Sequence, residues 1–88
     1  YVHRVDRATY VETAGGTSLR DSRSLSQVFQ ALDDPRFQYI ERGCFVNLDY
    51  VAGICGKEVF LKSGERLPAS SAQLAKVREE LFGLWGGE

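Results

Sequence analysis

The chain has 88 residues with 43% apolar and 26% charged content, an ordinary composition for one small globular domain. Its longest uncharged apolar runs last only a few residues, so we expect no membrane span and no secretory signal peptide. The formal net charge is −1 and neither half of the chain is basic, which disfavours a nucleic-acid binder with a broad basic field. Any positive patch must therefore be assembled by folding.

Residues 1–21 are predicted to form three short strands. Residues 1–5 (YVHRV) and 8–13 (ATYVET) are rich in β-branched and aromatic side chains, and an Ala-Gly-Gly turn signal precedes a third run at 17–21 (TSLRD). Consecutive short strands of this kind predict an antiparallel meander. The chain opens directly in the first run without an initiating methionine, so we expect it to be part of a longer protein.

The first helix is predicted to begin after Ser24. The Ser24 hydroxyl can accept hydrogen bonds from first-turn amides, and Gln27, three residues later, completes a capping box. The apolar residues that follow recur at helical spacing: Leu25, Val28, Phe29 and Leu32. The Asp-Asp-Pro run at 33–35 ends the helix, because the residue before a proline avoids helical backbone.

The middle of the chain returns to strand patterns. The predicted strands are residues 37–40, 44–46, 51–55, 58–62 and 65–69. Residues 47–50 predict a single helical turn, and Ser63-Gly64 predicts a two-residue hairpin turn. Alternation within 58–62 is imperfect, so the pattern does not show which face of that strand is buried.

A second helix is predicted to start at Ser70, which forms a second capping box with Gln73. Its apolar stripe consists of Leu74, Val77 and Leu81, and the glycines at 83, 86 and 87 are expected to fray its end. Residues 1–88 are therefore predicted to be one mainly β domain of about eight short antiparallel strands and two short helices. The many turns and the lack of βαβ spacing argue against a parallel sheet.

Residue types that support catalysis are sparse. The chain has one histidine, His3, no glycine-rich phosphate loop, and scattered acidic residues, so we expect no enzyme activity, cofactor or metal site. Cys44 and Cys55 follow no metal-ligand spacing and each lies in an apolar stretch, which predicts core thiols in a reducing cytosol. The alternative is a thiol sensor in which the two cysteines pair.

Arg42 is the first candidate for a binding residue. It lies in FQYIERGCFVNLDYV (residues 37–51), between two predicted strands, after Glu41 and before Gly43. A loop or bulge at this place would hold the arginine on a rigid base and present it to a partner. The alternative is a surface residue that pairs with Glu41 or with solvent. Asn47 is interpreted as the cap of the helical turn that follows it.

The same segment resembles the LytTR family of bacterial DNA-binding domains. The pattern is F-x-x-x-x-R-G-x-x-V-N-L-x-x-V in residues 37–51, then V-x-L-x-x-G-x-x-L-P-x-S in residues 59–70. Tyr1-Val2 is similar to the family's Y-I-E strand, and Ser24-Leu25 to the S-L that opens its helix. The resemblance implies a small antiparallel β sandwich of packed sheets with little helix, preceded by a further strand. It also implies that loops, not a recognition helix, enter the major groove.

Seven residues are candidates for DNA contact, most of them from the resemblance and Lys76 from its expected exposed position on the second helix. They are Arg42, Gly43, Tyr39, Thr9, Arg7, Ser71 and Lys76. Arg42 occupies the arginine of the family's H-R-S loop, and its guanidinium fork suits O6 and N7 of guanine. Thr9 falls near a third contact position, on the loop between the first two strands.

The chain also departs from the family pattern. Glu41 replaces the histidine of H-R-S and would repel phosphate, and Ser71 replaces an arginine that usually reaches DNA. Tyr39 stands where arginine is common in relatives. Arg7, Ser71 and Lys76 are expected to contact phosphates, with Ser70 first of all a helix cap.

These expectations define two hypotheses. The first is a sequence-specific double-stranded DNA-binding domain of a cytoplasmic bacterial transcription regulator, placed behind a receiver or sensor domain of a two-component system. Its few basic residues predict weak binding by a monomer. We therefore expect two copies to bind a direct repeat in promoter DNA, as a homodimer on DNA. The alternative is a protein-interaction or regulatory module that kept the fold but lost DNA contact.

Overall fold

The first three strands form the predicted antiparallel meander. In this computed structural model, which describes residues 1–84, they are β1 (Val2–Val5), β2 (Ala8–Glu12) and β3 (Ser18–Asp21). The register places Arg4 opposite Thr9 and Val11 opposite Leu19. Asp6 adopts a left-handed conformation (φ 57°) in the β1–β2 turn, a backbone region that aspartate tolerates better than most residues. This tight turn and the five-residue connection between β2 and β3 keep the meander local in sequence.

Eight strands in the described part of the chain form two antiparallel sheets. β4 (Phe37–Glu41) and β5 (Cys44–Asn47) join the meander in a five-stranded sheet with the order β3-β2-β1-β5-β4. The second sheet consists of β6 (Val51–Cys55), β7 (Glu58–Leu61) and β8 (Arg66–Pro68). A 3-10 turn, η1 (Leu48–Tyr50), connects the sheets, and Asn47 caps it as predicted by accepting from the Asp49 amide at 2.9 Å.

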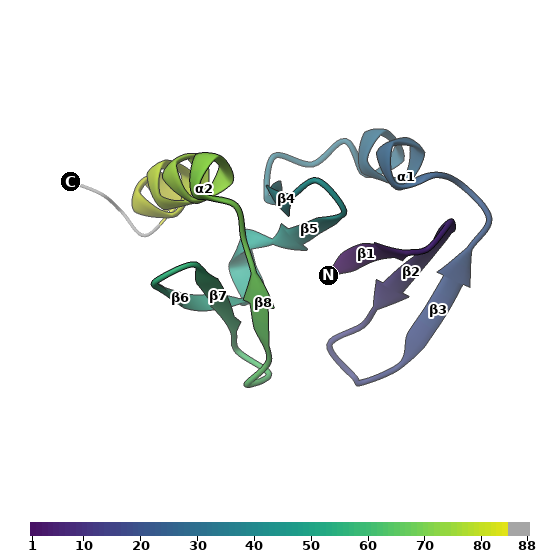
Figure 1. Cartoon of the computed structure of the whole chain (residues 1–88), viewed down its shortest axis with the longest axis horizontal. Helices are drawn as coiled ribbons and strands as arrows, with labels where there is room; N and C mark the ends of the chain where they lie inside the picture. Colours follow the sequence, from purple (N-terminus) through teal and green to yellow (C-terminus); the bar gives the residue numbers. More distant parts are fainter. Residues whose placement is uncertain (85–88) are drawn as a thin grey trace.

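Two helices complete the described part of the fold. α1 (Leu25–Leu32) begins at a complete capping box in which the Ser24 side chain accepts from the Gln27 amide and the Gln27 side chain accepts from the Ser24 amide. α2 (Ser71–Leu84) packs against β4. Figure 1 shows the β1–β3 meander on one side of the molecule, the second sheet and α2 on the other, and β4 and β5 between them. The antiparallel, mainly β architecture predicted from the sequence is thus confirmed.

The core consists of two clusters that lie on opposite faces of β5. Phe45 and Val2 pack with Leu25 and Val28 of α1. The larger cluster joins β4 and β5 to the second sheet and α2: Ile40, Cys44, Val46, Leu48, Val51, Val59, Leu61, Ala69, Leu74, Val77 and Leu81. Because successive residues of a strand face opposite sides, β5 contributes to both clusters and ties the two halves together. Val59 and Leu61 form the buried face of β7, which the sequence pattern of residues 58–62 did not identify.

Three local predictions need correction. The β7–β8 connection is a three-residue loop, not a two-residue turn: Leu61 exchanges backbone hydrogen bonds with Gly64 and Glu65, and Gly64 supplies φ +96°. The second capping box is half formed, because the Ser70 amide donates to the Ile40 carbonyl at 2.9 Å. α2 continues through Gly83, and the fraying predicted at residues 86 and 87 lies outside the described residues.

No helix within residues 1–84 is long and apolar enough to cross a membrane.

Candidate nucleic-acid interface

Arg42 lies on the tight turn that joins β4 to β5. Glu41 pairs with Cys44 across this hairpin, and a register shift between Tyr39 and Glu41 marks a bulge just before the turn. The Arg42 side chain is exposed, and it forms no ion pair with any residue of the described chain. A cation in this state keeps its full hydrogen-bonding capacity for a partner.

Glu41 does not neutralise Arg42. A Cβ built on Gly43 would lie 3.7 Å from Oε1 of Glu41, so this carboxylate is turned back over the glycine. Burial raises the pKa of Cys44 to about 12, and the charge of Glu41 adds to the rise, which also places the carboxylate near Cys44. The alternative in which Arg42 pairs with Glu41 is therefore wrong for this structure.

Backbone hydrogen bonds hold the Arg42 turn on both sides. On one side, the Arg4 amide of β1 donates to the Gly43 carbonyl at 2.9 Å. On the other, the Ser70 amide at the start of α2 donates to the Ile40 carbonyl, also at 2.9 Å. The turn is thus fixed between the meander and α2, so Arg42 projects from a rigid support.

An aromatic cluster lies beneath this support. Phe45 is fully buried, and its ring meets Phe29, Phe37 and Tyr39 edge-on at centroid distances of 5.0, 5.9 and 5.4 Å. Burial raises the pKa of Tyr39, and the charge of Arg4 partly opposes that rise. Tyr39, a predicted DNA contact, is therefore half-buried and chiefly packs beneath the turn.

Thr9 is a correction to the predicted site. It lies within β2, not on the loop between the first two strands, and its side chain is only 2% exposed. A side chain buried to this degree has no surface to offer a base or phosphate. The exposed residues of that loop are Asp6 and Arg7, so Arg7 keeps an accessible position and Thr9 does not.

The remaining candidates lie on α2. Ser71 is the first residue of the helix and is exposed, while the Ser70 hydroxyl accepts from the Gln73 amide at 3.3 Å. Lys76 is exposed five positions after Ser71, which puts it about 7.5 Å farther along the helix axis. The Ser70–Ile40 bond thus connects the residue before Ser71 to the strand that leads into Arg42, whereas Arg7 lies in the β1–β2 turn, three residues beyond Arg4, and Lys76 lies farther along α2.

Two further exposed cations, connected to the Arg42 hairpin by backbone hydrogen bonds, were not predicted. Arg4 is exposed beside Gly43, and Lys57 is exposed in the β6–β7 turn, where its carbonyl accepts from the Ala69 amide at 2.9 Å. Arg4 could have been noticed because it precedes the loop of Arg7 by three residues. Lys57 carries no local signal, since its position depends on a contact between residues 12 positions apart.

Several acidic side chains are already paired. Asp21 binds Arg23 at 2.8 Å, Arg36 binds Asp34 at 2.6 Å and Asp49 at 3.1 Å, and Glu12 lies 2.8 Å from His3. Hydrogen bonds from their arginine partners hold the pKa values of Asp21 and Asp34 at about 2. The Arg36 network lies beside Phe37, at the opposite end of β4 from Arg42. These carboxylates therefore add little negative field around the Arg42 turn.

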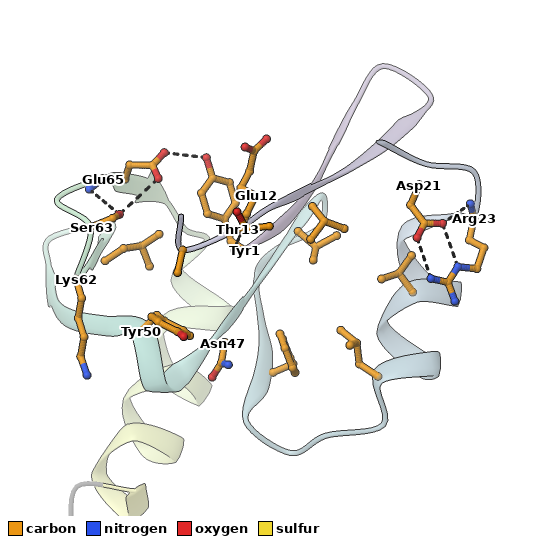
Figure 2. A pocket seen from close by; sticks show the side chains of 17 residues that line it. Tyr1, Glu12, Thr13, Asp21, Arg23, Asn47, Tyr50, Lys62, Ser63 and Glu65 are labelled. Carbon is orange, nitrogen blue, oxygen red and sulfur yellow. Dashed lines mark hydrogen bonds and ion pairs between the residues drawn. The ribbon is translucent and has the colours of Figure 1, made fainter. Parts of the chain in front are cut away.

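A groove of about 550 Å³ opens between the two sheets, away from the Arg42 turn. In Figure 2 the Tyr1 hydroxyl donates to Glu65 at 2.9 Å across one side of it, and the Asp21–Arg23 pair stands at the other. The apolar residues of its wall include Val11, Leu32 and Tyr50. None of the predicted DNA contacts lines it.

The cysteines differ from the prediction of two core thiols. Cys44 is buried, whereas Cys55 is exposed at the end of β6, on the other sheet. Both thiols are free, and within residues 1–84 no cluster of three or more His, Cys, Asp or Glu side chains is arranged to hold a metal ion.

Comparison with known proteins identifies the family. The family model described as the LytTr DNA-binding domain matches residues 1–82. No curated protein and no solved structure matches the chain. Because the family match spans nearly the whole sequence and the two-sheet fold agrees with it, this chain belongs to the LytTR family of DNA-binding domains.

Proposed function

We propose that this domain binds double-stranded promoter DNA with sequence specificity, and that the Arg42 turn enters the major groove. The observation that carries the proposal is the state of Arg42. It is exposed, it is unpaired among the described residues, and its turn is anchored by backbone hydrogen bonds at Gly43 and Ile40. A base-reading side chain needs this combination of free donors and fixed support.

The chemistry of the turn suits guanine. The planar guanidinium of Arg42 can donate two parallel hydrogen bonds to O6 and N7 in the major groove. Gly43 adds no side chain that would compete for the same space. Arg7 and Ser71 are exposed and contact phosphates, which fixes the register of the turn on the duplex. Lys76, set back along α2, contacts a more distant phosphate.

The cellular role follows as part of the same proposal. The domain is the output part of a cytoplasmic bacterial transcription regulator and acts behind a receiver or sensor domain. The small number of free cations limits the affinity of one domain, so two copies bind adjacent direct repeats, as a homodimer on DNA.

Arg42→Ala tests the base contact. Loss of a bidentate arginine–guanine contact costs about 1–3 kcal/mol, so affinity for target DNA should fall about 5- to 150-fold, with relaxed preference at one base pair. Fluorescence anisotropy against the target and against single-base variants of it measures both effects. Arg20→Ala is the matched control, because Arg20 is exposed on β3 and outside the Arg42 turn. If Arg42→Ala binds target and scrambled DNA as the parent does, the base contact is refuted.

A second candidate function has its own support. Compared with the family pattern, Glu41 in place of histidine and Ser71 in place of arginine both make the surface that would face DNA less positive. This difference favours a protein-interaction or regulatory module. A salt titration separates the two functions. DNA binding should weaken steeply as salt rises, whereas a protein interface dominated by apolar contacts should respond weakly.

A further inference from the structure

We propose that Arg4 and Lys57 contact DNA phosphates on the two sides of the Arg42 turn, so that both sheets hold the duplex. This inference rests on the DNA-binding function proposed above. It adds two contact residues, one from each sheet, and it assigns them a role in affinity but not in base preference.

Arg4 flanks the turn from the meander. Its amide donates to the Gly43 carbonyl at 2.9 Å, so its backbone lies one strand away from the turn, a spacing of about 4.8 Å. The side chain is exposed and has no ion pair within residues 1–84. It lies on the same face of the sheet as Val2, because residues two positions apart in a strand share a face. Arg4 therefore stands beside the groove-facing turn as a free cation.

Lys57 flanks the turn from the second sheet. Its carbonyl accepts from the Ala69 amide, and the next amide, that of Ser70, donates to the Ile40 carbonyl of β4. These two consecutive 2.9 Å bonds connect the β6–β7 turn to the strand that leads into Arg42. Gly56, with φ +60°, allows the tight turn that exposes Lys57. Lys57 is likewise free of ion pairs in the part of the chain that the structure describes.

The spacing of the two cations fits one groove. The path from Arg4 through Gly43, Ile40, Ser70 and Ala69 to Lys57 crosses three backbone hydrogen bonds, each about 4.8 Å between neighbouring strands, and follows the chain over residues 40–43 and 69–70, so the two backbones are at most about 28 Å apart. The major groove of B-DNA is about 12 Å wide, and both side chains are long and flexible. Arg4 and Lys57 can therefore reach phosphates on opposite borders of the groove that Arg42 enters.

Nearby carboxylates limit the affinity that the Arg4 and Lys57 contacts contribute. Asp6 is exposed in the β1–β2 turn, Glu58 is half-buried after Lys57, and Glu41 is turned over Gly43. They leave the surface only weakly positive, so each phosphate contact should be a large share of the total. The removal of one contact is then easy to resolve, because each neutralised phosphate contributes about 0.9 to the salt slope of log K.

The experiment compares charge-neutralised variants at two places. Arg4→Gln, Lys57→Gln and the double variant are titrated by anisotropy with target and scrambled duplexes over a range of salt. Each single change should lower the magnitude of the salt slope by about 1 and the double change by about 2. Affinity should fall equally for both duplexes, so the ratio between target and scrambled DNA stays the same. Circular dichroism checks that these exposed substitutions leave the fold intact.

Arg20→Gln and Lys62→Gln are the controls. Both remove one exposed positive charge, and Lys62 follows β7 at the end opposite to Lys57. Slopes for Arg4→Gln and Lys57→Gln that match those of the controls would overturn the inference, even if Arg42→Ala still relaxes base preference. A slope change in only one of the two variants would overturn the proposal that both sheets hold the duplex. A parent domain with no salt-dependent DNA binding would instead refute the proposed function itself.

Discussion

Phe45→Leu tests whether the aromatic cluster beneath the Arg42 turn stabilises the domain. Phe45 is 0% exposed in β5, two residues after Gly43. Its ring makes three edge-on contacts, to Phe29, Phe37 and Tyr39, and these residues come from α1 and β4. Leucine keeps an apolar side chain at the site but removes all three ring contacts at once.

The size of the effect follows from these contacts. An edge-to-face aromatic pair contributes about 0.5–1.5 kcal/mol beyond its buried area, so three pairs contribute about 1.5–4.5 kcal/mol. Leucine recovers part of the dispersion attraction, so we expect a loss of about 2 kcal/mol in the free energy of unfolding. A domain of this length is stable by about 4–13 kcal/mol, so the variant should still fold at low temperature.

Urea unfolding followed by circular dichroism measures the loss. With a slope near 1 kcal/mol per molar urea, which is usual for a small domain, the midpoint should fall by about 2 M. Phe82→Leu is the matched control, since the Phe82 side chain is 67% exposed and its replacement should move the midpoint little. If Phe45→Leu and Phe82→Leu share a midpoint within about 0.5 M, the aromatic cluster does not support the turn as argued.

Two further predictions concern thiol reactivity and acid stability. Burial raises the pKa of Cys44 to about 12, so in the native domain at pH 8 a colorimetric thiol reagent should modify exposed Cys55 alone, and both thiols only in urea; modification of both without urea would contradict this. Hydrogen bonds from Arg23 and Arg36 lower the pKa values of Asp21 and Asp34 from 3.8 to about 2, so their stabilising effect is complete above about pH 4 and is lost as the pH falls towards 2. The urea midpoint of Asp34→Asn should therefore depend less on pH than that of the parent between pH 5 and 2, and parallel curves would refute the contribution of that pair.

Local sequence signals predicted the elements well, and their limits have a clear physical origin. The Ser24 box forms completely because both of its partners lie within one helical turn. At Ser70 the same signal is only half satisfied, since a distant carbonyl, that of Ile40, takes the Ser70 amide. A capping pattern reports what the local chain can do, and a long-range hydrogen bond can replace half of it.

The candidate site likewise contains residues that local sequence predicts and residues that only long-range contacts bring into place. Arg42 was predicted because its hairpin is encoded by contiguous residues, and the structure exposes it on that hairpin. Thr9 was misplaced because its contact role was carried over from the family resemblance, although the strand predicted at residues 8–13 already included it. Its burial depends on which face of β2 meets the core, and strand pairing sets that register. Lys57 was missed because only a long-range contact, between the β6–β7 turn and Ala69, connects it to β4 and the Arg42 turn.

The net charge of −1 is compatible with DNA binding because the fold separates its charges. Arg23 pairs with Asp21, and Arg36 pairs with both Asp34 and Asp49, whereas the cations around the Arg42 turn have no carboxylate within ion-pair distance in the described chain. A small set of free cations supplies little sequence-independent affinity, because non-specific binding scales with the number of phosphates neutralised. Base contacts must then provide a larger share of the binding free energy. A domain of this kind should bind any single site weakly but discriminate strongly between target and random DNA, and pairing on adjacent repeats raises affinity without loss of that discrimination.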